Sequence, residues 1–510
     1  MSKDNTYKGI YAMHKYWGKK PFHEISRFIE KYSEPGEVVL DSFCGSGITL
    51  IEAAKLKRKC VGVDLNPIAI KIAQVSLTAV DIEELYKAFD GIKEKLKSVI
   101  YSMYTVKEDG KKTLVTHTIW KNETPIEVWY ETEQKKKTIR EGREIDFKMA
   151  NHPSVKAKWY PQSLMYENSR INVGEKQRVC DLFTKRALTG LSLLAEEIEK
   201  IEDKKIRNVL ELTLSGTLSQ ASKLVFVIRD RKKNGKTSER AEVGSWVVGY
   251  WVPEEHFEIN VWNCFENRFR RVLKGEEEIN SIFKSQEEDS DNIDVSLFQC
   301  SATKLPLEDN SVDYVFIDPP HSNRILYMEM SLMWNAWLKL DSGISWEDEI
   351  VVSEAKGREK DSENYNTLLD KAFSEIHRVL KSNRYFSMAF NCLKDDIWLN
   401  ILNLFVRYGF ELSDIVPLEY SATSVVQDNR KNALKTDFVL TFRNTDRGRQ
   451  KIIFKEDKEL LKNKVEDIFN KNSNAQTYYI INKLFEETIP QGYIFRVSDI
   501  VKQCAARGDK

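Results

Sequence analysis

Two short apolar runs, far apart in the chain, each end in an acidic residue and a tight turn. Val38–Leu40 precedes the segment Asp41–Gly47 (Asp-Ser-Phe-Cys-Gly-Ser-Gly), and Val315–Ile317 precedes the segment Asp318–His321 (Asp-Pro-Pro-His). Short apolar runs bounded by turn residues are consistent with buried strands. Open α/β sheets place their ligands outside the carboxyl ends of such strands. We therefore expect a binding site at each of these turns.

The rest of the chain alternates between strand-like and helix-like patterns on both sides of a long interruption. Helices are expected at 22–34, 47–57, 325–339, 362–380 and 395–408, with one more beginning at Ile68 behind Asn66-Pro67. Strands are expected at 37–41, 60–64, 296–300, 314–317, 385–390 and 437–442. This order predicts a doubly wound, Rossmann-like α/β sheet that is interrupted by a large, mostly helical insertion.

These patterns divide the chain into four segments. Residues 1–80 and 293–450 are the two halves of the sheet domain, 81–292 is the insertion, and 451–510 is a small C-terminal helical extension with helices at 456–470 and 475–487. The lysine-rich run 133–143 in the insertion is interpreted as a solvated loop or hairpin, and a contact to DNA phosphates is the alternative.

Composition restricts the class of protein. The 510 residues include 78 basic and 78 acidic side chains, so any surface for nucleic acid must be a local patch. No run approaches the roughly 20 apolar residues of a membrane span, and the first residues lack the apolar core of a signal peptide. The seven cysteines are scattered without a CxxC pair, which favours reduced thiols and a cytoplasmic protein without a zinc site.

The first turn has the features of a nucleoside-binding loop. Gly45 and Gly47 lack β-carbons, so the backbone can approach a ligand and the next helix presents its N-terminus. Asp64 ends the following strand, where an acidic residue typically accepts hydrogen bonds from ribose hydroxyls. A dinucleotide-binding fold without methyl transfer is the alternative interpretation of this unit alone.

The second turn has the features of a rigid loop that holds an amine. Two prolines fix the backbone after Asp318, whose carboxylate can accept a hydrogen bond from an exocyclic NH2 group, while the Pro319 carbonyl can accept another. The amine lone pair could then attack a sulfonium methyl group held at the first turn, a reaction that needs positioning and no metal. A kinked strand end with a capping aspartate is the alternative.

Both segments resemble motifs of the amino-group (N6-adenine and N4-cytosine) DNA methyltransferase family. Asp41–Gly47 is similar to the cofactor motif Asp-Pro-Phe-Cys-Gly-Ser-Gly, and Asp318–His321 is similar to the catalytic motif (Asp/Asn/Ser)-Pro-Pro-(Tyr/Phe/Trp). The segments His14–Pro21 and Ser322–Leu338 also match the family's pattern. The resemblance covers about 1–80 and 293–445, and it departs from the pattern at Ser42 and at His321, which stands where an aromatic ring would stack on the target base.

The resemblance implies S-adenosyl-L-methionine as cofactor and double-stranded DNA as partner, with adenine N6 favoured over cytosine N4 by the Asp-Pro-Pro form. It implies cofactor contacts at Trp17, Lys19, Asp41, Phe43, Cys44, Gly45, Gly47, Asp64, Asn66, Ser301 and Ala302, and catalytic roles at Asp318, Pro319, Pro320 and His321. Trp17 and Lys19 could instead form a helix entry, Ser301 and Ala302 a simple strand end, and His321 an ordinary surface position.

The insertion is the expected target-recognition region, because it lies between the cofactor motif and the catalytic motif. Basic residues near aromatic ones suit phosphate contact, and the candidates are Lys232, Lys233, Lys236 and Arg270. The setting implied is restriction-modification or phage defence, with a cognate restriction or defence protein as a further partner. An RNA base N-methyltransferase and a catalytically silent DNA-binding subunit of a defence complex remain alternatives.

Overall fold

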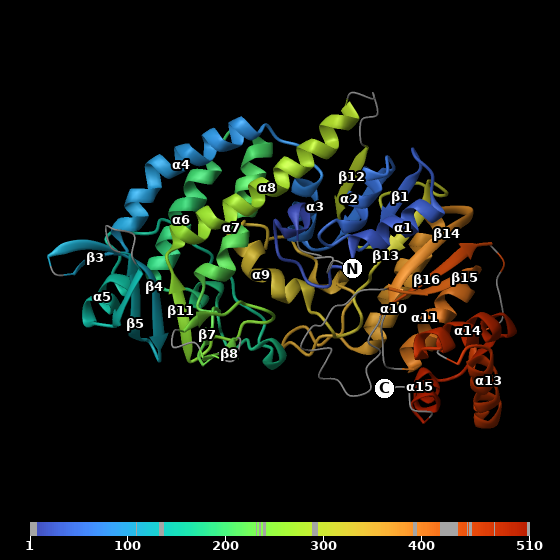
Figure 1. Ribbon diagram of the computed structural model, residues 1–510. Helices are drawn as coiled ribbons and strands as arrows, with labels where there is room; N and C mark the ends of the chain where they lie inside the picture. Colours follow the sequence, from blue (N-terminus) through green and yellow to red (C-terminus); the bar gives the residue numbers. More distant parts are fainter. Residues whose placement is uncertain are drawn as a thin grey trace.

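A seven-stranded sheet forms the centre of the protein in a computed structural model (Figure 1). The structure describes residues 8–108, 110–131, 137–230, 232–233, 236–237, 241–287, 294–390, 395–418, 437–445, 447, 451–473 and 475–506. In spatial order the strands are β12 (Val295–Gln299), β2 (Lys59–Asp64), β1 (Val38–Asp41), β13 (Val312–Ile317), β14 (Leu380–Phe390), β16 (Phe438–Asn444) and β15 (Phe410–Pro417).

Five strands of this sheet run parallel to one another, from β12 to β14. Strand β16 is inserted between β14 and β15 and runs antiparallel to both. The order reverses at β1, where β2 and β13 lie on either side, so the carboxyl ends of β1 and β13 flank a crevice. The predicted doubly wound sheet is confirmed, although β15 was not predicted.

Helices cover both faces of the sheet, as the alternation of buried residues requires. Val39 and Phe316 belong to one apolar core, and their neighbours Leu40 and Ile317 belong to the other. Successive residues of a strand point to opposite faces, which explains the unbroken apolar runs in the sequence. The helices of this domain are α1 (Phe22–Tyr32), α2 (Ile48–Lys55), α3 (Pro67–Ser76), α9 (Tyr327–Trp337), α10 (Ser362–Val379) and α11 (Asp395–Arg407).

Helices dominate the insertion, as predicted, but it also contains a five-stranded antiparallel sheet that was not predicted. Its helices are α4 (Ile82–Ser102), α5 (Glu144–Asn151), α6 (Lys185–Glu199), α7 (Lys204–Ala221) and α8 (Val261–Glu287). The sheet consists of β3 (Thr105–Glu108), β4 (Lys111–Lys121), β5 (Thr124–Glu131), β6 (Lys137–Glu141) and β11 (Glu255–Ile259). Strand β6 covers residues 137–141 of the lysine-rich run and pairs antiparallel with β5, while residues 132–136 lie outside the described part of the chain.

The helices of the insertion share a core with the sheet domain. Helix α7 contacts α3 and α9, and α8 contacts the short turn Gly9–Ala12 near the N-terminus. One continuous apolar cluster therefore joins Ile72, Leu210 and Trp334. Figure 1 shows the five-stranded sheet at the far end of this helical layer, on the opposite side from the C-terminal helices.

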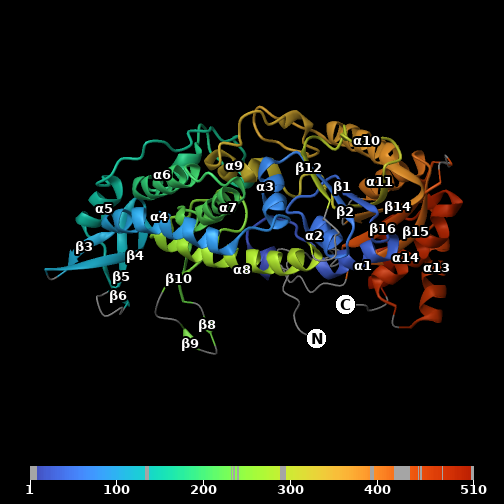
Figure 2. The ribbon, with the colours of Figure 1, turned by 90° about the horizontal axis from the view of Figure 1, so that it is seen from above.

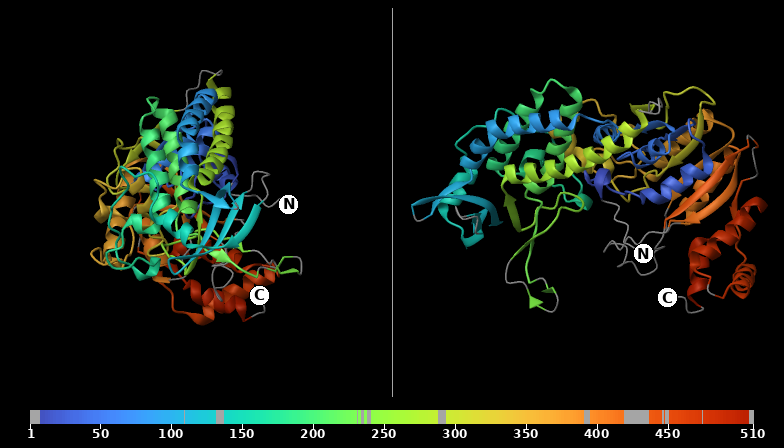
Figure 3. Two further views of the ribbon diagram at one scale, coloured as in Figure 1. Left: turned by 90° about the vertical axis from the view of Figure 1, so that its left-hand side faces the viewer. Right: turned by 45° about the horizontal axis from the view of Figure 1, so that its top comes forward.

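Two small features project from the body on one side (Figures 2 and 3). One is the ribbon formed by β7 (Val227–Ile228), β8 (Lys232–Lys233), β9 (Lys236–Thr237) and β10 (Glu242–Val243). The other is the C-terminal extension with β17 (Ile453–Phe454), α13 (Lys458–Lys471), α14 (Thr477–Thr488), β18 (Tyr493–Ile494) and α15 (Val497–Ala505). The extension packs against α11, where the rings of Trp398 and Phe485 are 5.7 Å apart.

Two negative findings concern the described residues only. No helix among them has both the length and the apolar character that a membrane crossing requires. Their His, Cys, Asp and Glu side chains do not gather into a group of three or more that could bind a metal ion.

Candidate functional site

The glycine turn forms a closed loop after β1. The Gly47 amide donates to the Cys44 carbonyl at 2.7 Å, and the Cys44 amide donates to Val63 on the neighbouring strand at 3.0 Å. Gly47 has φ +79°, and a β-carbon there would lie 2.9 Å from the Ala73 side chain. This position accepts only glycine without strain, because both the backbone angle and the space exclude a side chain.

Asp64 holds this turn from the end of β2. Its carboxylate accepts hydrogen bonds from the Gly45 and Asn66 amides, each at 2.8 Å. Asn66 in turn binds helix α9, because its side chain donates to Ser331 at 2.8 Å and accepts from Asn335 at 3.1 Å. The turn, the acidic residue and α9 therefore form one rigid unit.

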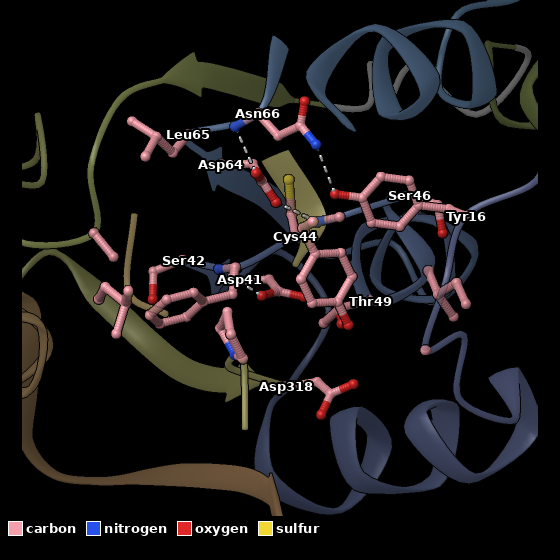
Figure 4. A pocket seen from close by; sticks show the side chains of 18 of the residues that line it. Tyr16, Asp41, Ser42, Cys44, Ser46, Thr49, Asp64, Leu65, Asn66 and Asp318 are labelled. Atoms are coloured by element: carbon pink, nitrogen blue, oxygen red, sulfur yellow. Dashed lines mark hydrogen bonds between the residues drawn. The ribbon is translucent and has the colours of Figure 1, made fainter. Parts of the chain in front are cut away.

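A single pocket contains both motifs that the sequence singled out (Figure 4). Its empty space, including the open mouth, is about 900 Å³. Asp64 and Asp318 lie on opposite sides of it, and Asp41 lies between them. The predicted residues that line it are Trp17, Lys19, Asp41, Phe43, Cys44, Gly45, Asp64, Asn66, Ser301, Ala302, Asp318 and Pro320.

Lys20 connects the catalytic loop to the far side of the sheet, and the sequence analysis did not single it out. Its ammonium lies 3.0 Å from one carboxylate oxygen of Asp318 and 3.0 Å from Asp437, which precedes β16. The other Asp318 oxygen, Oδ1, is buried and has no hydrogen-bond partner. Lys20 therefore fixes one oxygen of Asp318, while the second oxygen lies beside the His321 ring.

Lys19, the neighbouring lysine, has a different environment. Its ammonium donates to the carbonyls of Tyr11 and His14 at 2.8 and 2.9 Å. Burial lowers its pKa to about 7, and Arg268 adds to this effect. Lys19 thus contributes its stem to the pocket wall, while its charged end stabilises the N-terminal segment.

The two prolines and His321 complete the catalytic loop. Tyr365 donates to the Pro320 carbonyl at 2.9 Å, and Pro319, whose carbonyl is the predicted acceptor for a substrate, is not among the residues that line the pocket. His321 does not line the pocket; its ring packs edge-on against Phe390 with the centroids 5.3 Å apart. Its Nε2 atom lies 3.4 Å from Asp318 Oδ1. Neither ring nitrogen has a hydrogen-bond partner among the described residues.

The predicted DNA contacts lie outside this pocket. Lys232, Lys233 and Lys236 belong to the β8–β9 hairpin, whose backbone is described and whose side chains lie outside the described part. Arg270 is exposed on α8, where it donates to Glu266 at 3.2 Å. The structure therefore does not bring these four residues together with the pocket, and their role stays a prediction.

Burial changes the acid–base behaviour of two pocket carboxyls. It raises the pKa of Asp41 to about 7 and that of Asp64 to about 6, although both accept backbone hydrogen bonds. The folded protein therefore holds more protons than the unfolded chain between about pH 4 and about pH 7, so its free energy of unfolding falls as the pH rises through this window. A ligand whose hydroxyls donate to Asp64 favours the ionised form of this carboxyl. Such a ligand therefore restores the free energy of unfolding that is lost as the pH rises.

The direction of this pH dependence gives a prediction for ligand binding. The gain in melting temperature that S-adenosylhomocysteine produces is expected to increase between about pH 5 and about pH 8. Thermal unfolding with and without the ligand, measured across this range, tests it. The Asp64→Asn variant is the control, because it should flatten the dependence. A gain that stays constant or decreases with pH in the unmodified protein would contradict the assignment of Asp64.

The strand order and the pocket together define a Rossmann-like α/β fold with a ligand site at the carboxyl ends of its parallel strands. The family model of the N6/N4 methyltransferases, described as DNA methylase, matches residues 2–75. The matched segment, which holds the glycine turn and Asp64, is therefore similar to the N6/N4 DNA methylase family, whose cofactor is S-adenosyl-L-methionine.

Relatives of known activity match short parts of the chain. The type II methyltransferase M.MjaII of Methanocaldococcus jannaschii is 29% identical over 97 residues, which are 19% of this chain and 18% of that protein. The type II methyltransferase M1.MboII of Moraxella bovis is 41% identical over 63 residues, 12% of this chain and 24% of the other. A ribosomal protein L11 methyltransferase of Clostridium botulinum is 41% identical over 68 residues, 12% and 22% of the two chains.

The chain thus spans about a quarter or less of the length of each of these relatives. Among solved structures, a SAM-dependent methyltransferase from Methanosarcina mazei aligns with 82% of this chain and 97% of its own, with 8% identity and a TM-score of 0.26. That score is too low for a detailed comparison, so the fold assignment rests on the strand order.

Proposed function

We propose that this protein is an S-adenosylmethionine-dependent DNA methyltransferase that modifies an exocyclic amino group, with adenine N6 as the target. One observation carries the proposal: the glycine turn with Asp64 and the Asp-Pro-Pro loop open into the same pocket. The type II methyltransferases among the relatives support DNA as substrate, whereas the ribosomal protein methyltransferase shows that similarity over this length does not by itself define one.

The residues of the pocket suit a direct transfer. The Asp64 carboxylate would accept the ribose hydroxyls, and the Asp41–Gly47 turn would face the amino-acid end of the cofactor. When bound, the cofactor supplies an electrophilic methyl group. Asp318 Oδ1 and the Pro319 carbonyl would accept the two amine hydrogens and orient the nitrogen lone pair. After transfer, the methylated nitrogen carries an extra proton, which the Asp318 carboxylate would accept.

The target base must leave the duplex, because its amine is otherwise paired and stacked. The insertion, between the cofactor motif and the catalytic motif, is the proposed target-recognition region. The restriction-modification or defence setting and a cognate partner protein belong to the same proposal, by analogy with the type II relatives.

Methyl transfer from tritiated cofactor tests the proposal directly. We expect label in unmethylated bacterial DNA and none in tRNA, and single-molecule sequencing of DNA from cells that express the gene should report N6-methyladenine at a fixed motif. Label in tRNA alone would favour the RNA methyltransferase, and cofactor binding without turnover on any nucleic acid would favour the silent subunit.

The residue at the aromatic position of the motif gives a second prediction. His321→Tyr is expected to keep or raise activity on adenine if position 321 only stacks on the extruded base, because base–aromatic stacking contributes about 1–3 kcal/mol. The initial rate of label transfer measures this. An inactive Tyr variant that still binds DNA and cofactor would instead indicate a specific hydrogen bond from the imidazole.

A further inference from the structure

One loop of the insertion exposes aliphatic side chains beside the pocket. Val247 and Val248 are 63% and 53% exposed, whereas the flanking Trp246 and Tyr250 are almost fully buried. Most loop tips carry polar residues, and exposed apolar groups on a fixed support often mark an interaction site. We call residues 246–250 the valine loop.

The valine loop is held firmly by the N-terminal segment. The Lys15 ammonium donates to the carbonyls of Trp246 and Val247 at 2.5 and 2.6 Å. The Trp17 indole donates to the same Val247 carbonyl at 3.1 Å. Trp17 also lines the pocket, and Lys20, which binds Asp318, is only three positions further along the chain. Three residues span at most about 11 Å, so the loop is supported by the wall of the pocket itself.

The buried side chains of the loop fix its shape from below. The ring of Trp246 lies 5.6 Å from Trp17 and 5.5 Å from Trp334, measured between centroids. The Tyr250 hydroxyl donates to the Met330 carbonyl on α9 at 2.6 Å. Gly249 has φ +71°, and a β-carbon there would lie 2.9 Å from the Ile171 carbonyl. The two valines are therefore presented on a rigid base and cannot easily fold back.

Cationic groups border the loop next to the catalytic segment. The Tyr250 amide donates to the Ile171 carbonyl at 2.6 Å. The adjacent Arg170 is exposed and donates to the Arg324 carbonyl at 3.2 Å, three residues after His321. An apolar tip with Lys15 and Arg170 near it, and with the Arg324 backbone beside Arg170, fits a polyanion with an apolar interior. That is the description of a DNA duplex.

We propose that the valine loop enters the DNA duplex and that Val247 and Val248 occupy the space left by the extruded base, with Arg170 and Arg324 against the flanking phosphates. Apolar side chains that unstack a base step act in this way in other DNA-binding proteins. The proposal rests on the proposed function, because it assumes DNA as the substrate. It assigns to this loop a role in base extrusion, the step that precedes methyl transfer.

The test compares duplex DNA with single strands, which need no extrusion from a stack. In the Val247→Ser/Val248→Ser double variant, label transfer to unmethylated duplex DNA should fall by about tenfold or more, while transfer to the same DNA after heat denaturation should stay within about twofold. Ile145→Ser is the matched control, since Ile145 is an aliphatic residue of the insertion with 49% exposure on α5. It should change neither rate.

A DNA-binding measurement tests the role of the valine loop without any methyl transfer. The unmodified protein should bind a duplex that contains an abasic site more tightly than the intact duplex, and the double variant should lose this preference. Equal loss on duplex and single strands, or an unchanged preference, would overturn the proposal, and no effect on either DNA readout would indicate a protein partner for the loop. A wrong assignment of the proposed function would give a different result from a wrong assignment of the loop, because the unmodified protein would then label no DNA at all.

Discussion

Replacing Asp318 with alanine is expected to abolish methyl transfer while the affinity for the cofactor stays within a few-fold. Asp318 lies across the pocket from Asp64, and its carboxylate is assigned to the substrate amine. Loss of a charge-assisted hydrogen bond costs about 1.5–3 kcal/mol, and the loss of orientation adds to it. The measurements are label transfer to DNA and calorimetric titration with S-adenosylhomocysteine.

Asp348→Ala is the control for this experiment. Asp348 also lines the pocket, but its carboxylate accepts a hydrogen bond from Ser345 at 2.5 Å in the loop after α9. The control should retain most of the activity. Because Lys20 also contacts Asp437, the Asp318 variant still leaves the lysine with a counter-ion, so the fold should be retained. Substantial turnover by Asp318→Ala would show that the catalytic loop is misassigned.

The opposite pattern is expected for Asp64→Ala, which should raise the dissociation constant of the cofactor by about tenfold or more. This carboxylate is assigned to the ribose hydroxyls, and it also orders the glycine turn through the Gly45 amide. Part of the turnover should return at high cofactor concentration, because Asp318 is unaffected. Calorimetric titration gives the affinity, and the dependence of the rate on cofactor concentration gives the recovery.

Asp64→Asn separates the two roles of this residue. The amide keeps an oxygen that can accept from a backbone N–H group, so the turn should persist in thermal unfolding while the charge is lost. Unchanged binding in both variants would mean that the nucleoside lies elsewhere in the pocket. Together with the Asp318 variant, these substitutions distinguish cofactor binding from chemistry.

The sequence was sufficient for six of the seven strands of the sheet and for the position of both motifs, because each is a local pattern. Apolar runs that end in Asp41 and Asp318 define strands whose carboxyl ends share one edge of a parallel sheet. The five-stranded sheet of the insertion was missed, and its strand β6 lies in the lysine-rich run 133–143, which was interpreted as a loop or hairpin. The β-branched residues between Leu114 and Ile119 were the available signal.

Only the tertiary structure distinguished Lys19 from Lys20. The two lysines are adjacent and chemically identical in the sequence, yet one ammonium binds backbone carbonyls and the other binds Asp318 and Asp437. The same holds for the valine loop, whose supports at Lys15 and Trp17 are more than two hundred residues away in the chain. A local pattern determines where a strand ends, whereas the partner of a side chain depends on which distant segments the shared core brings together.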